Sequence, residues 1–166
     1  RLEGALDGAA LEGARCGVVG RHESVRTLFP GTGGVPRQQV ISPAHLALAV
    51  TPSTEGALAA ALSCAASAGF ELSRELPLRA HLFALAADRH VLLLVLHHIA
   101  GDGWSLAPLW RDLSWFYAAR CGGGAASLPA LPVQYADYTL WQQALLGEEG
   151  DASSALSRQL GYWRER

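Results

Sequence analysis

The sequence predicts an α/β fold. The neighbouring segments Leu78–Ala86 and Arg89–Leu96 are rich in aliphatic residues, and only Ala87 and Asp88 separate them, which indicates two antiparallel strands joined by a tight turn. Segments with the apolar spacing of helices lie before and after this pair. Because half of the 166 residues are hydrophobic, the chain can bury one sizeable core.

The other elements follow from local signals, and no internal repeat interrupts them. The elements expected before the strand pair are a helix at 2–20, a turn-rich break at 31–36, extended segments at 38–41 and 45–50, and a helix that Ser53 or Thr54 caps and that runs to about Ala68. Those expected after it are a helix at 105–120, a loop from Gly122 to about Pro132, and helices at 134–146 and 153–165.

Composition limits the classes of function. The net charge of −2 gives no general electrostatic reason for binding nucleic acid or an anionic membrane. The sequence contains no secretory signal or membrane span, and its three cysteines are far apart, so we expect free thiols and a cytoplasmic location. The chain starts at Arg1 and contains no Met, which favours a piece of a longer enzyme, truncated at both ends.

The most informative segment is LHHIAGDGWS at 96–105, directly after the aliphatic run 91–96. Six aliphatic residues are too few to cross a membrane but suit a strand that is covered on both faces. Because successive side chains of a strand point to opposite faces, His97 and His98 cannot both face one cavity. We therefore expect one histidine to face a site and the other to pack.

Plainer interpretations of this segment stay open. A histidine after a strand is commonly a structural residue, and Asp102-Gly103 alone is a turn signal. The two histidines and Asp102 could supply three metal ligands, but no second cluster of histidine or cysteine has metal-like spacing, so no metal is expected. Gly101 and Gly103 permit a tight turn or a close backbone approach on either side of Asp102.

The pattern HHxxxDG resembles the signature of the condensation domains of nonribosomal peptide synthetases. Four further segments resemble motifs of that family and occur in the family's order: RHESVRTLF at 21–29, FELSRELPLRAHLF at 70–83, LPALPVQYADYTLWQQ at 128–143 and GYWRER at 161–166. The resemblance covers nearly the whole chain. It implies a chloramphenicol acetyltransferase-like sandwich, with residues 1–166 as the N-terminal lobe of a two-lobed condensation domain whose C-terminal half is missing.

The implied reaction is amide formation. In the family, an acyl or peptidyl thioester on one carrier protein domain is attacked by the amino group of an aminoacyl thioester on the next. No cofactor is bound directly, since the phosphopantetheine arms of the carrier domains deliver both substrates. A neighbouring adenylation domain is a further expected partner. The fragment alone is expected to have little or no activity.

The resemblance also assigns residues. His98 would act as general base or position the amine, His97 would pack beside it, and the backbone N–H of Gly103 would lie near the developing oxyanion. An arginine of the early motif would form a salt bridge with Asp102, which makes Arg26 the first candidate for its partner and Arg21 the second. Trp104 adjoins the motif and is expected to support the site, whereas the other tryptophans are expected to pack in a core or an interface.

Alternatives remain within and outside the family. Epimerisation domains share an HHxxxDG-like core, and a non-catalytic relative would serve as a docking platform for carrier or tailoring proteins. A free-standing transferase that uses a coenzyme A thioester would share HxxxD but not the later tyrosine- and tryptophan-containing segments. The intact histidines favour an enzyme over the platform.

Overall fold

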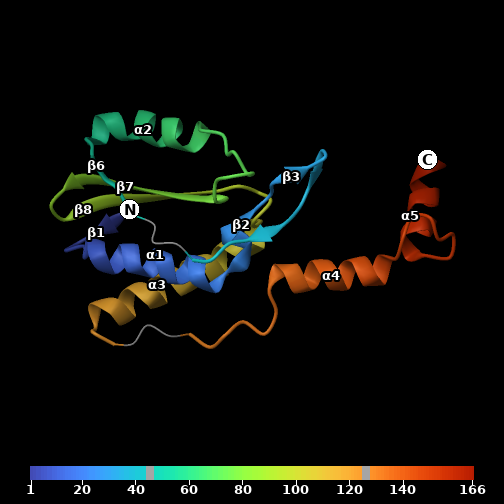
Figure 1. Cartoon of the computed structure of the whole chain (residues 1–166). Coiled ribbons are helices and arrows are strands. Elements are labelled where there is room, and N and C mark those ends of the chain that lie inside the picture. Colours follow the sequence, from blue (N-terminus) through green and yellow to red (C-terminus); the bar gives the residue numbers. More distant parts are fainter. Residues whose placement is uncertain (44–46, 125–127) are drawn as a thin grey trace. The chain divides into compact units, whose positions relative to one another are not determined.

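The computed structural model describes residues 1–43, 47–124 and 128–166. These residues form two compact units, Arg1–Ala130 and Leu131–Arg166. In the first unit, a sheet lies between α2 (Glu55–Ser67) on one face and the helices α1 (Gly8–Arg21) and α3 (Leu106–Cys121) on the other (Figure 1). The predicted mixture of helices and strands is therefore present as three layers.

The sheet has four strands in the order β1-β8-β7-β6. Its centre is the antiparallel pair β7 (Leu78–Ala86) and β8 (Arg89–Leu96), with Leu78 opposite Leu96 and Phe83 opposite Val91. Both strands have the predicted bounds, and Ala87 and Asp88 form the turn. The edge strand β6 (Val50–Pro52) runs parallel to β7.

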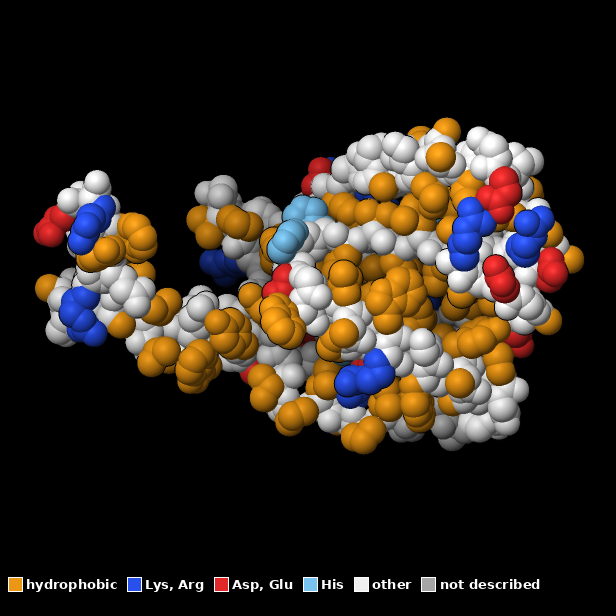
Figure 2. Space-filling view, turned by 180° about the vertical axis from the view of Figure 1, so that it is seen from behind, with side chains coloured by type: hydrophobic (Ala, Val, Ile, Leu, Met, Phe, Trp, Pro, Cys, Tyr) orange, Lys and Arg blue, Asp and Glu red, His pale blue; other side chains and the backbone are white. Residues whose placement is uncertain are grey.

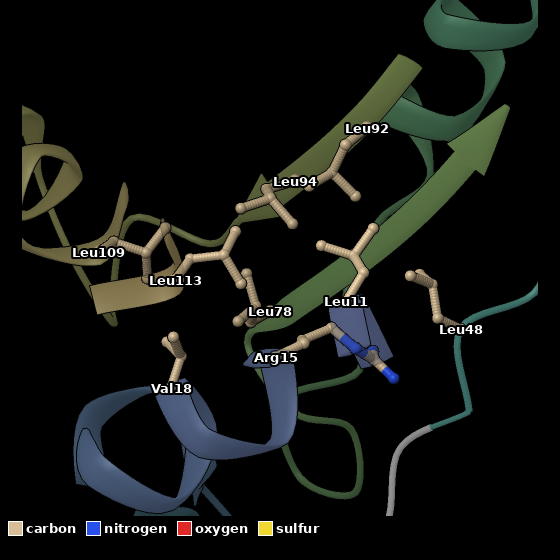
Figure 3. Close-up of a pocket in the computed structure, with 9 residues that line it drawn as sticks. All are labelled: Leu11, Arg15, Val18, Leu48, Leu78, Leu92, Leu94, Leu109 and Leu113. Atoms are coloured by element: carbon tan, nitrogen blue, oxygen red, sulfur yellow. The ribbon is translucent and has the colours of Figure 1, made fainter. Parts of the chain in front are cut away.

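Both faces of β8 are covered, as its aliphatic run predicted. Val91 packs with Leu58 of α2 and Phe83 of β7, and Leu93 lies against the same cluster. Leu92 and Leu94 point the other way, toward α1 and α3 (Figure 3). Successive side chains of β8 therefore point to opposite faces of the sheet, one face toward α2 and the other toward α1 and α3.

The main core lies between the sheet and the helices α1 and α3. Leucines from β7, β8, α1 and α3 converge there around a cavity of about 10 Å³, which is about the space of one water molecule (Figure 3). Gly17 of α1 allows the close approach of the helices, because a Cβ atom there would lie 2.9 Å from the Phe116 ring. Glycine at this position of α1 thus lets α1 pack closely against α3.

The first helix begins later than predicted. Leu2–Glu3 is the short strand β1, which pairs with His90 and Arg89 of β8. The helix begins only after Asp7, whose carboxylate accepts a hydrogen bond from the Ala10 N–H at 2.9 Å. Edge pairing with the sheet and this N-cap override the apolar spacing of the first residues.

Short elements connect α1 to the sheet. They are the 3₁₀ helix η1 (Glu23–Arg26), β2 (Thr27–Leu28), which pairs with β5 (Gln39–Val40), and β3 (Gly31–Thr32), which pairs with β4 (Val35–Pro36). The predicted break is the β3–β4 hairpin, with Gly33 and Gly34 at φ values of 62° and 82°. Residues 45 and 46 of the predicted segment 45–50 lie outside the described residues, and the strand there begins at Val50.

The other helices agree with the sequence. Thr54 caps α2 by accepting from the Ala57 N–H at 3.3 Å. The 3₁₀ helix η2 (Gly103–Ser105) precedes α3, and the second unit contains α4 (Tyr135–Leu146) and α5 (Ala155–Arg164). Cys16, Cys64 and Cys121 are free thiols. No helix in the described part of the chain is both long and apolar enough to span a membrane.

The tryptophans do not enter the core of the described chain. Their exposed fractions range from 37% for Trp115 to 90% for Trp104. The helix α4 has no buried residue, and its rings Tyr135, Tyr138 and Trp141 contact one another with centroids 5.6 and 5.7 Å apart. The tryptophans other than Trp104 were expected to pack in a core or an interface, and the structure contradicts core packing.

Candidate functional site

The motif forms the turn between β8 and η2. His97 is the histidine that packs: its ring stands edge-on to Phe70 at a centroid distance of 5.7 Å. The backbone N–H of His97 donates to the Pro77 carbonyl at 2.9 Å, and the ring Nδ1 of His97 accepts from the backbone N–H of Ile99 at 3.1 Å. His97 therefore holds the turn to the segment before β7.

His98 lies in the turn itself and is exposed. No hydrogen bond from its imidazole occurs among the residues that the structure describes, so both ring nitrogens are available to a ligand. Histidine appears at the molecular surface beside hydrophobic side chains in Figure 2. The expectation that one histidine packs and the other does not is therefore met, but β8 ends at Leu96 and His98 lies in a turn, so strand alternation is not the cause.

Asp102 caps the helix that follows the motif. Its carboxylate accepts from the Ser105 N–H at 3.0 Å and from the Ser105 hydroxyl at 2.8 Å, and that hydroxyl accepts from the Asp102 N–H at 3.0 Å. These hydrogen bonds, chiefly the one from the hydroxyl, lower the pKa of Asp102 below its ordinary value. Asp102 is therefore an ionised capping residue at the surface.

The two glycines of the motif have different surroundings. A Cβ atom on Gly101 would lie 2.8 Å from Cδ2 of Leu96 and 3.1 Å from Cβ of Ser105, so any other residue there requires the Leu96 and Ser105 side chains to shift. A Cβ atom on Gly103 would meet nothing within 4 Å. The backbone N–H of Gly103, at the start of η2, keeps its expected role near an oxyanion as a prediction.

The prediction that Arg26 or Arg21 forms a salt bridge with Asp102 is wrong: the structure gives both arginines other partners. Arg26 pairs instead with Glu23 at 3.1 Å and donates to the Ile41 carbonyl, and Arg21 pairs with Asp112 at 2.9 Å. Because Asp102 is exposed and capped by Ser105, solvent and local donors satisfy its charge without an arginine. Both arginines hold the early motif to its neighbours.

A buried carboxylate lies beneath the site. The Asp112 side chain is 1% exposed and accepts from Arg21 at 2.9 Å, from His22 Nε2 at 2.8 Å and from Arg111 at 2.9 Å. Burial alone would raise the pKa of Asp112, but the hydrogen bonds from His22, Arg111 and Arg21 lower it below its ordinary value. Asp112 therefore ties the early motif to α3, the helix that follows the HHxxxDG motif.

The sequence itself carries a signal for a buried Asp112. Position 112 falls on the same helix face as Leu109, Leu113 and Phe116, which are all buried. A charged residue within such a stripe needs a partner, and the arginine and histidine of the early motif supply it.

A cavity of about 220 Å³ lies beside the motif. Its walls come from three segments: His22, Ser24 and Val25 after α1, Leu96 and Ala100 on either side of His98, and Ser105 with the start of α3. No group of three or more histidine, cysteine or carboxylate side chains could hold a metal ion within residues 1–43, 47–124 and 128–166. Trp104 projects into solvent and does not line this cavity.

Comparisons with known proteins agree on one family. The family model named Condensation domain matches residues 1–166. The chain is 53% identical over 164 residues to CymA of Salinispora arenicola, a probable non-canonical nonribosomal peptide synthetase, covering 99% of this chain and 2% of that protein. It is 51% identical over 168 residues to the isonitrile lipopeptide synthase of Mycobacterium tuberculosis, covering 98% of this chain and 7% of that protein.

A solved structure with 40% sequence identity to this chain has the same fold. In the complex of the X-domain and OxyB from teicoplanin biosynthesis, the matched chain superimposes with a TM-score of 0.92 at 40% identity, and the match covers 99% of this chain and 36% of that one. This match confirms the expected fold class. The chain spans a small part of its curated relatives and about a third of the solved chain.

Proposed function

Because the chain belongs to the condensation domain family, we propose that the intact domain forms an amide bond between a donor acyl or peptidyl thioester and the amino group of an acceptor aminoacyl thioester. The observation that carries this proposal is the pair of histidines at the end of β8, one packed and one open to a ligand. The open histidine, His98, faces no competing partner in the described residues.

His98 acts chiefly by positioning the acceptor amine. An α-amino group has a pKa of about 7.7–8.0, so freeing it of its proton near pH 7 costs only about 1–1.4 kcal/mol. Correct placement of two reactants supplies about 7–11 kcal/mol. Positioning is therefore the larger contribution, and the Gly103 N–H is the group that stabilises the developing oxyanion.

The substrates arrive on partners. Carrier protein domains bring both thioesters on phosphopantetheine arms, and an adjacent adenylation domain loads the acceptor. The remaining part of the domain supplies the other wall of the site, in keeping with the 36% share of the solved relative that this chain covers. Residues 1–166 are then the N-terminal lobe of that domain.

The test uses the intact domain with separately loaded donor and acceptor carrier domains, and mass spectrometry follows the transfer. Wild type is expected to form the amide, and His98→Ala is expected to reduce the rate by about 100-fold, the loss that misplacement of a reactant can cause. The matched control is His90→Ala, a histidine of β8 outside the motif. An unchanged rate in His98→Ala refutes the assignment of His98.

A second function is the docking platform. The teicoplanin X-domain, 40% identical to this chain, has been solved in complex with OxyB. If the intact domain forms no amide with a broad panel of donors but binds a tailoring enzyme in a titration, the platform replaces the enzyme as the better account.

A further inference from the structure

A series of side-chain contacts leads from the end of α2 to the motif histidines. Residues 68–77 connect α2 to β7, and Phe70 lies in this connection. Its ring contacts one side chain from β7 and one from the turn after β8: the Arg79 guanidinium lies 4.0 Å from the ring centroid, and the His97 ring lies nearly perpendicular at 5.7 Å. Phe70 therefore links β7 to the motif turn.

Three acceptors hold Arg79 in place. Its guanidinium donates to the carbonyls of Ala68, at 3.0 Å, and Gly69, which follow α2, and to the Glu75 carboxylate at 2.6 Å. A planar guanidinium has five N–H donors, so it can bind all three acceptors while it lies over an aromatic ring. A cation is also favourable at the carboxyl end of a helix. Arg79 thus fixes the segment that carries Phe70.

The other contact of Phe70 is with the histidine that orders the motif turn. Nδ1 of His97 accepts from the backbone N–H of Ile99 at 3.1 Å. This bond closes the backbone around His98, the residue proposed to place the acceptor amine. Because the acceptor direction of Nδ1 lies in the plane of the imidazole, rotation of the His97 ring breaks the bond. The Phe70 ring beside His97 opposes that rotation.

We propose that Phe70 and Arg79 are positioning residues for amide transfer: they hold the His97 ring and, through its bond to Ile99, the turn that carries His98. Both belong to the segment FELSRELPLRAHLF at 70–83. They act through His97 and not by contact with the substrate. The inference rests on the proposed function and deepens it.

The experiment measures the transfer rate of the intact domain at saturating acceptor in a double-mutant cycle. Phe70→Leu keeps an apolar side chain but removes the aromatic face. His97→Asn removes the imidazole, while its amide oxygen can accept from the Ile99 N–H, since asparagine commonly bonds the backbone two residues later. Urea unfolding of each variant is recorded alongside.

We expect Phe70→Leu to lower the rate of the otherwise wild-type domain by about 10-fold, less than the roughly 100-fold that a misplacement of 1 Å can cost. In the His97→Asn background, the same substitution should change the rate by less than about 2-fold, because the ring through which Phe70 acts is gone. Equal losses in the two backgrounds overturn the proposal, as does a wild-type rate in Phe70→Leu.

A second pair of variants tests Arg79 without changing either ring. Arg79→Met removes the cation and its three hydrogen bonds and is expected to slow transfer. Arg74→Met is the matched control, because Arg74 lies in the same segment, is exposed, and makes no side-chain hydrogen bond among the described residues. Equal rates in Arg79→Met and Arg74→Met overturn the assignment of Arg79.

Hydrogen exchange of the Ile99 amide tests the inference without the transfer reaction. Loss of the bond to His97 opens this amide to water, so its exchange in the intact domain should be faster in Phe70→Leu and Arg79→Met than in wild type and Arg74→Met. Unchanged exchange overturns the proposal. If wild type forms no amide with any donor, the proposed function fails, and the exchange of the Ile99 amide then decides by itself whether these residues hold the turn.

Discussion

Replacing Asp112 by alanine is expected to destabilise the domain by about 3 kcal/mol, because it leaves buried donors without an acceptor. Removing one partner of a buried ion pair costs about 3–5 kcal/mol. The lower end applies here: the side chain of Arg111 is 70% exposed and can turn to water, while those of Arg21 and His22 are only 13% and 20% exposed.

Urea unfolding of the intact domain measures this loss. With a slope of about 2 kcal/mol per molar, 3 kcal/mol lowers the midpoint by about 1.5 M at an unchanged slope. The control is Asp102→Ala, which removes an exposed cap worth about 1 kcal/mol. If Asp102→Ala destabilises the domain as much as Asp112→Ala does, the assignment of the buried partner is refuted, and the salt bridge expected from the sequence regains support.

The pH dependence gives an independent check on Asp112. Its pKa in the folded chain is lowered, so its contribution to stability is present above the unfolded pKa of about 3.9 and is lost as the pH falls toward the folded pKa. Asp112→Asn cannot titrate at this position. The difference in unfolding free energy between wild type and Asp112→Asn should therefore be constant near neutral pH and shrink below about pH 4; a constant difference down to pH 2 contradicts this account.

Two further predictions concern the motif and the second unit. Gly101→Ala is expected to cost about 1–3 kcal/mol because its Cβ would lie 2.8 Å from Leu96, whereas Gly103→Ala should change the unfolding free energy by less than about 0.5 kcal/mol; equal effects would contradict the close approach. Trp141→Ala in the intact domain is expected to cost about 3–5 kcal/mol if the rest of the domain covers α4, and the exposed Gln143→Ala is its control; a cost near zero would show that the ring stays in water.

The strand pair and the difference between the histidines could be predicted because both depend on short-range rules. The turn at Ala87 and Asp88 and the aliphatic run after it determine β7 and β8, and the two histidines follow directly after β8, where His97 packs on Phe70 and His98 is exposed. The cap at Thr54 is equally local. Such features need only neighbouring residues, so the sequence carries them without knowledge of the tertiary fold.

The partners of the arginines could not be predicted in this way. Arg21 lies 91 positions from Asp112, and nothing near either residue indicates that α1 and α3 pack side by side. The family resemblance directed attention to Asp102, a residue that is satisfied locally by Ser105. β1 was missed for the same reason, since its pairing with β8 joins residues that are far apart in the sequence.

The helix α4 shows the same difference between features that neighbouring residues determine and features that depend on distant contacts. Its local signals are complete, with a capping box of Gln134 and Asp137 and a glycine at its end, so the helix was predictable. Its aromatic face is different: Tyr135 and Trp141 remain 55% and 57% exposed, which their large apolar area makes unfavourable in water. Within the unit Leu131–Arg166, no residue of α4 is buried. A helix that is fully specified locally but exposes its aromatic face within its own unit calls for a cover outside that unit, and this is why the stability that Trp141 contributes has to be measured in the intact domain.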